Sequence, residues 1–157
     1  MITLYMPKKR INRKNDKEVI HLNESLLYQF RTNIFSSKFE LFNQNDKLLF
    51  TAKQVTLFRN HYDIYQNDTV ISSLVTKSYF KQYQYYIKSN KDNLFVEGSI
   101  VNSQFSLREE NEVVLTISKD PQKNYRRIIT VDESQKDYLI MVMLSLIVAV
   151  ETFMASN

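Results

Sequence analysis

The run Tyr138-Leu-Ile-Met-Val-Met-Leu-Ser-Leu-Ile-Val-Ala-Val150 decides the fold of this chain. It contains no Gly or Pro, and Ser145 is its only polar residue before Glu151. A helix built from this run would be apolar on every side instead of along one stripe, so it must be enclosed by protein or by lipid. We expect the helix to run from about Gln135 to about Ala155.

Enclosure by protein fits this helix better than a membrane span. A span needs about 20 apolar residues, and here Asp137 and Glu151 flank a shorter run. A carboxylate at a helix centre in lipid also costs about 2.5 to 3.5 kcal/mol on insertion scales. The sequence therefore predicts a buried core helix and no transmembrane span.

The start of the helix carries a capping pattern. Ser134 is expected as the N-cap, and Asp137 follows three residues later as in a capping box. Acids in the first turn also face the positive end of the helix dipole.

The rest of the chain reads as a series of β-hairpins. Aromatic-led strands begin 20 to 23 residues apart at Phe39, Tyr62, Tyr85, Phe105 and, more weakly, Tyr125. Polar turns follow the first four, and each turn leads into a second apolar strand, at residues 48–52, 70–75, 94–97 and 113–117. Upstream, residues 2–6 form a possible strand, and 18–22 with 26–30 a hairpin. This spacing is typical of an all-β meander.

Alternation within these strands predicts one apolar face. Phe39 and Leu41 fall on one side and Glu40 on the other. The same pattern places Tyr62, Ile64, Tyr85, Ile87, Phe105 and Leu107 on the apolar face. A single amphipathic sheet of about ten strands curls or closes on itself, and the apolar helix would fill its interior.

Composition narrows the class of protein. The chain has 157 residues, which fits a single domain over 1–157. It has no Cys, which excludes disulfides and thiolate chemistry, and its single Gly excludes the glycine-rich phosphate-binding loops. The N-terminus lacks a signal-peptide pattern, so we expect a cytoplasmic protein, with peripheral membrane association as an option.

Six short stretches give the chain a resemblance to a known family. They are Leu4-Tyr-Met-Pro-Lys8, Ile34-Phe-Ser-Ser-Lys-Phe-Glu-Leu-Phe42, His61-Tyr-Asp-Ile-Tyr65, Phe95-Val-Glu-Gly98, Leu115-Thr-Ile-Ser-Lys119 and Val131-Asp-Glu133. In this order they resemble the bacterial branch of the LURP-one-related, or tubby C-terminal-like, superfamily, which includes the phospholipid scramblases. The resemblance covers nearly the whole chain. It implies a mainly β fold, a twelve-stranded antiparallel β-barrel or curled sheet of hairpins around a central hydrophobic C-terminal α-helix.

Several candidate sites have simpler interpretations. Scramblase relatives carry an acidic segment before the last helix, which suggests calcium at residues 132–137, but Lys136 and Asp137 stand where a calcium loop needs an oxygen ligand and Gly. His21 and His61 lack metal-ligand spacing. The Tyr-rich residues 79–86 could stack on single-stranded nucleic acid, but they suit strands equally. We therefore predict no metal, no cofactor, no catalytic residues and no nucleic-acid partner.

The strongest functional feature is a basic cluster after the first strand. Its six cations could attract an anionic phospholipid surface; they are Lys8, Lys9, Arg10, Arg13, Lys14 and Lys17. The competing interpretation is a solvated arm. We expect a monomeric, non-enzymatic binding module, with a protein-interaction or stress-response scaffold as the alternative class.

Overall fold

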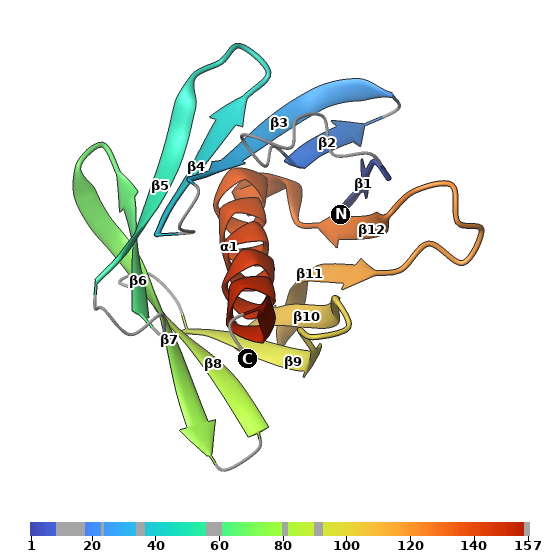
Figure 1. Ribbon diagram of the computed structural model, residues 1–157. Helices are drawn as coiled ribbons and strands as arrows, with labels where there is room; N and C mark the ends of the chain where they lie inside the picture. Colours follow the sequence, from blue (N-terminus) through green and yellow to red (C-terminus); the bar gives the residue numbers. More distant parts are fainter. Residues whose placement is uncertain are drawn as a thin grey trace.

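The protein is built from antiparallel strands curved around one C-terminal helix (Figure 1). The computed structural model describes residues 1–8, 18–22, 24–33, 37–55, 61–79, 82–89 and 93–155. The side chains of 18–22, 76–79, 82–89, 93 and 151–155 are outside this description. The predicted mainly β class with a C-terminal helix is confirmed.

Consecutive strands pair in antiparallel fashion along the chain. Within the described residues they are β1 Ile2–Met6, β2 Glu18–Leu22, β3 Ser25–Thr32, β4 Lys38–Asn43, β5 Leu48–Gln54, β6 His61–Gln66, β7 Thr69–Tyr79, β8 Gln82–Ser89, β9 Asn93–Ser99, β10 Gln104–Glu109, β11 Glu112–Ser118 and β12 Arg127–Val131. The last strand, β12, returns to pair with β1 over the whole length of β1. The strand order then closes through β2.

Two neighbouring pairs of strands are joined by far fewer paired positions than the other pairs, and we call these two places seams. Among the described residues, the only position that pairs between β1 and β2 is Tyr5 with His21. Between β8 and β9 two positions pair, Ile87 with Leu94 and Lys88 with Asn93. The strands thus fall into two curved groups, β2–β8 and β9–β12 with β1, that meet at these narrow seams.

The apolar face predicted from alternation lines the interior. Phe39, Leu41, Ile64 and Leu107 are fully buried, and Tyr62 and Phe105 are nearly so. Tyr85 and Ile87 lie among the side chains outside the described set. Aromatic rings pack together across several strands, because the Phe39 ring of β4 lies 5.8 Å from the ring of Phe30 in adjacent β3 and 4.9 Å from that of Tyr62 in β6, beyond β5. The described inward side chains of these strands therefore belong to one continuous core.

The helix α1, Lys136–Ala155, runs through the space that the strands surround (Figure 1). Every residue from Leu139 to Leu146 is buried, Ser145 included. A helix buried on all sides needs partners in every direction, and the two curved groups of strands supply them. The predicted end of the helix at about Ala155 is confirmed.

The predicted N-cap was wrong by two residues. A 3-10 turn, Glu133–Gln135, precedes α1, and its cap is Asp132, not Ser134. The Asp132 Oδ1 atom accepts from the Ser134 N–H at 3.1 Å and from the Ser134 hydroxyl at 3.0 Å. Asp132 takes this role because its N–H still donates to the Val114 carbonyl of β11 at 2.8 Å, which keeps its backbone extended while the next residues coil.

Asp137 has a different partner from the one the capping box required. Its carboxylate accepts a hydrogen bond from the hydroxyl of Tyr28, a buried residue of β3. Burial, with this hydrogen bond and the nearby negative charge, raises the pKa of Tyr28 above its ordinary range. On another side, the Gln135 amide donates to Glu109 of β10 at 2.9 Å. The start of the helix is thus fastened to both groups of strands.

Tyr28→Phe should lower the free energy of unfolding by about 1 to 3 kcal/mol at pH 8, since a charge-assisted hydrogen bond is lost. A raised pKa in the folded state means that this contribution is complete below about pH 10 and declines above it, as the unfolded chain ionises first. Urea unfolding at pH 8 and pH 11 should therefore show the advantage of the wild type shrinking at the higher pH. An equal difference at both values would contradict the contact.

Candidate functional site

The predicted basic cluster begins at the end of β1. Lys8 follows Pro7 and is exposed. The other five residues, Lys9, Arg10, Arg13, Lys14 and Lys17, lie outside the described residues. Lys8 therefore shows where on the molecule the cluster starts, and the residues around Lys8 belong to the candidate site.

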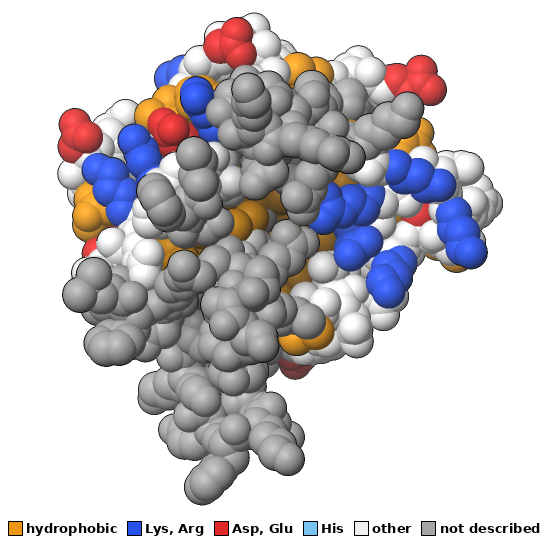
Figure 2. Space-filling model, viewed as in Figure 1, with side chains coloured by type: hydrophobic (Ala, Val, Ile, Leu, Met, Phe, Trp, Pro, Cys, Tyr) orange, Lys and Arg blue, Asp and Glu red, His pale blue; other side chains and the backbone are white. Residues whose placement is uncertain are grey.

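The loop between β11 and β12 lies beside Lys8. The Arg126 N–H donates to the Met6 carbonyl at 2.8 Å, and Arg127 pairs with Met6 across the two strands. This brings a second set of cations to the same side of the molecule; we call residues 119–127 the basic loop, with Lys119, Lys123, Arg126 and Arg127. Figure 2 shows Lys and Arg side chains gathered on the side where this loop lies in Figure 1.

Sequence reasoning missed the basic loop as part of the site. Its four cations are spread between polar residues and lie more than a hundred positions after Lys8. Only the pairing of β1 with β12 brings the two segments together. The basic loop could have been assigned to the site from the sequence only if the pairing of β1 with β12 had been predicted.

Asp120 gives the basic loop its shape. Its carboxylate accepts from the backbone N–H groups of Tyr125 at 2.9 Å, Asn124 at 2.9 Å and Gln122 at 3.0 Å. Lys123, between them, adopts a left-handed backbone with φ of 59°. The hydrogen bond from the Tyr125 N–H lowers the pKa of Asp120 most, and the other two N–H groups and the positive charge of Lys8 lower it further. Burial acts in the opposite direction and raises the pKa, but it does not outweigh them. The loop is therefore folded around an ionised acid.

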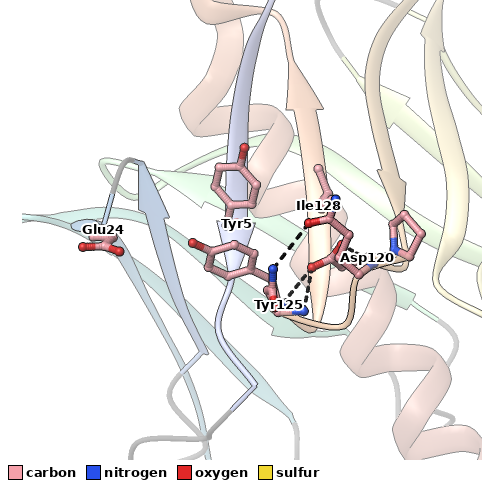
Figure 3. A pocket seen from close by; sticks show the side chains of 8 residues that line it. Tyr5, Glu24, Asp120, Tyr125 and Ile128 are labelled. Carbon is pink, nitrogen blue, oxygen red and sulfur yellow. Dashed lines mark hydrogen bonds between the residues drawn. The ribbon is translucent and has the colours of Figure 1, made fainter.

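A pocket of about 590 Å³ opens between this loop and the turn that joins β2 to β3 (Figure 3). We call it the tyrosine pocket; it is lined by Tyr5, Glu24, Asp120, Pro121, Gln122, Asn124, Tyr125 and Ile128. The rings of Tyr5 and Tyr125 lie with centroids 4.5 Å apart and planes tilted by 35°. The pocket sits at the seam between β1 and β2, where Tyr5 pairs with His21.

The other candidates from the sequence do not assemble into a site. His61 in β6 lies 3.2 Å from Asp63, which also accepts from the Ser73 hydroxyl at 2.6 Å. The side chain of His21 is outside the described set. No group of three His, Cys, Asp or Glu side chains converges in the part of the chain that the structure describes. In the acidic segment before α1, Asp132 serves as a cap.

A second groove, of about 430 Å³, lies on the outer face of β4, β5 and β6. Lys53 there stands 5.1 Å from the centroid of the Tyr65 ring. Lys38 and Lys53 line it together with Glu40 and Asp68, so it carries charges of both signs. This mixture of charges selects no particular ligand.

The model of the LURP-one-related family matches residues 2–149. The chain belongs to the LURP-one-related family. The X-ray structure of a protein from Arabidopsis thaliana is similar to it, with a TM-score of 0.61 and 14% sequence identity, over 94% of this chain and 88% of the plant protein. At this identity the likeness shows the fold alone. No match was found among curated proteins.

Among the described residues, no helix combines the length and the apolarity that crossing a bilayer requires.

Asp120→Asn should lower the urea midpoint of unfolding at pH 7. Both carboxylate oxygens of Asp120 accept hydrogen bonds from backbone N–H groups, whereas the amide of Asn has only one acceptor oxygen. A lowered pKa means that the Asp120 contribution is present above about pH 4 and is lost as the pH falls further. The difference in urea midpoint between Asp120→Asn and the wild type should therefore become smaller below pH 4. Asp46→Asn, at an exposed turn with φ of 61°, is the control; an equal effect of both substitutions would refute the role of Asp120.

Proposed function

We propose that this protein is a non-enzymatic binding module that associates with the anionic surface of a phospholipid membrane. The contact is made by the basic cluster Lys8, Lys9, Arg10, Arg13, Lys14 and Lys17. Membership of the LURP-one-related family and the tubby-like fold support a binding module in general terms. The lipid surface is the further step that we propose.

The observation that carries the proposal is the position of the basic loop beside Lys8. Lys119 and Lys123 in this loop are exposed, and the loop is joined to the end of β1 through Met6. The one acid in the loop, Asp120, has its carboxylate oxygens on backbone N–H groups. The cations of the loop therefore extend the field of the basic cluster over one side of the molecule.

A surface of this kind suits a bilayer better than a discrete small anion. Each Lys or Arg close to an anionic membrane contributes about 1 kcal/mol, and the attraction falls off within a Debye length, about 8 Å at physiological salt. Several cations spread over a face act together only on an extended partner. Binding should accordingly weaken as salt is added.

Co-sedimentation with vesicles tests the proposal. Wild-type protein should sediment with vesicles that contain phosphatidylglycerol, and 0.5 M salt should release it, because screening weakens exposed charges. Replacing the six cluster cations by Gln should abolish sedimentation, and Lys119→Gln with Lys123→Gln should reduce it. The matched control replaces Lys38, Lys47 and Lys53 of the β4–β5 hairpin by Gln and should sediment like wild type.

Two outcomes would overturn this function. One is failure of the wild type to sediment with anionic vesicles, and the other is equal sedimentation of the wild type and the cluster variant. A stoichiometric protein partner that the cluster variant still captures would instead favour the protein-interaction class.

A further inference from the structure

The tyrosine pocket and its rim carry opposite charges. Two carboxylates, Glu24 and Asp120, line the pocket, and among the described residues no Lys or Arg lines it. Cations stand immediately outside. Lys123 lies between the lining residues Gln122 and Asn124 in the loop, and the charge of Lys8 acts on Asp120. A cation is favoured inside the pocket and an anion at its edge.

The interior of the pocket suits an organic ammonium group. The faces of Tyr rings attract ammonium ions, and aromatic side chains with a nearby carboxylate are the usual recognition site for substituted ammonium. Tyr5 and Tyr125 are both half-buried, so parts of their rings remain open to a ligand. In Figure 3 the Tyr125 side chain extends from the loop toward the turn that carries Glu24.

Glu24 is the second carboxylate that lines the pocket. It adopts a left-handed conformation with φ of 70° in the turn between β2 and β3, and its side chain is exposed. Asp120, on the opposite side of the pocket, is the ionised acid around which the basic loop folds. The ammonium group would thus meet the carboxylate of Glu24, whereas the oxygens of Asp120 accept from backbone N–H groups of the basic loop and add only their negative charge.

The rim suits the phosphate that accompanies such an ammonium group in many headgroups. Lys8 and Lys123 are exposed and stand near lining residues in the chain: Lys8 follows Tyr5 by three residues, and Lys123 lies between Gln122 and Asn124. Lys acts on phosphate as a compact point charge and does not require a fixed fork of donors. The volume of about 590 Å³ falls within the range of small-molecule pockets.

We propose that the tyrosine pocket binds a phospho-ammonium headgroup, with its substituted ammonium against the open side of the Tyr5–Tyr125 ring pair and beside Glu24, and its phosphate at Lys8 and Lys123. The chemistry is that of phosphocholine, whether free or at the end of a lipid. This site rests on the proposed membrane function and refines it. The basic cluster attracts the protein to the surface without selecting a lipid, and the pocket selects the headgroup.

Titration of the full chain with three probes, followed by ¹⁵N chemical shifts, tests the site. Phosphocholine should shift the amides of Tyr5, Glu24 and Tyr125 in a saturable manner. Tetramethylammonium should shift the same amides with weaker affinity, because it lacks the phosphate. Inorganic phosphate should leave them unmoved. Phosphate alone reproducing the phosphocholine shifts, or no shift at these amides with phosphocholine, would overturn the proposal.

Substitutions separate the aromatic and the acidic contributions. Tyr125→Leu removes the ring but keeps the backbone N–H that Asp120 accepts, and it should weaken phosphocholine binding about three- to tenfold, the range of a partly exposed cation–π contact. Glu24→Gln should weaken it also. The controls are Tyr65→Leu, on the outer face of β6, and Glu110→Gln, in a turn with φ of 55°. Equal weakening by substitutions and controls would contradict the site.

Vesicles distinguish a lipid headgroup from a free ligand. With phosphatidylglycerol held constant, replacing neutral diacylglycerol by phosphatidylcholine should strengthen wild-type binding but not that of Tyr125→Leu. If phosphocholine binds and the vesicles make no difference, the ligand is the free compound and the lipid form of the proposal fails. If the cluster-dependent sedimentation holds but phosphocholine does not bind, the pocket proposal fails and the membrane function stands.

Discussion

The structure depends on the need to enclose a helix that is apolar on every side. From Leu139 to Leu146, every residue of α1 is buried, so no face of the helix is exposed to solvent there. The helix therefore needs strands around it in all directions. The strands meet this need because their described inward side chains are large and apolar. The hairpins in turn need the helix. Without it the curved sheet would surround an empty space, so that water would enter the interior or the sheet would collapse. Each part thus supplies the burial that the other lacks.

Much of this arrangement could be predicted from the sequence. The period of two in the strands led from Phe39 and Leu41 to the buried face, and the uninterrupted apolar run led to the helix. The cap and the seams could not be predicted in the same way. Asp132 caps the turn because its N–H is still bonded to β11, and Asp137 is bonded to Tyr28 of β3; both facts depend on contacts between segments far apart in the chain. The seams reflect how far neighbouring strands remain side by side.

The candidate site shows the same division between local and distant information. A cluster of six cations is visible in any reading of residues 8–17. The basic loop and the tyrosine pocket exist only because β12 pairs with β1 and so places Tyr125 against Tyr5. Charges of one sign at a rim and of the other within a pocket are a property of the folded chain. The closing strand pair that completes the enclosure of the helix therefore also assembles the site.

Native-state hydrogen exchange of the α1 amides tests the enclosed helix most directly. If both groups of strands must separate before the helix is exposed, the amides of residues 139–146 will exchange only through global unfolding. Their free energies of exchange, and the dependence of these on denaturant, will then equal those of the slowest amides in β10 and β11. Exchange of the helix amides at a clearly lower free energy than those strand amides would contradict the account, because the helix would then leave its enclosure while the sheet stays paired.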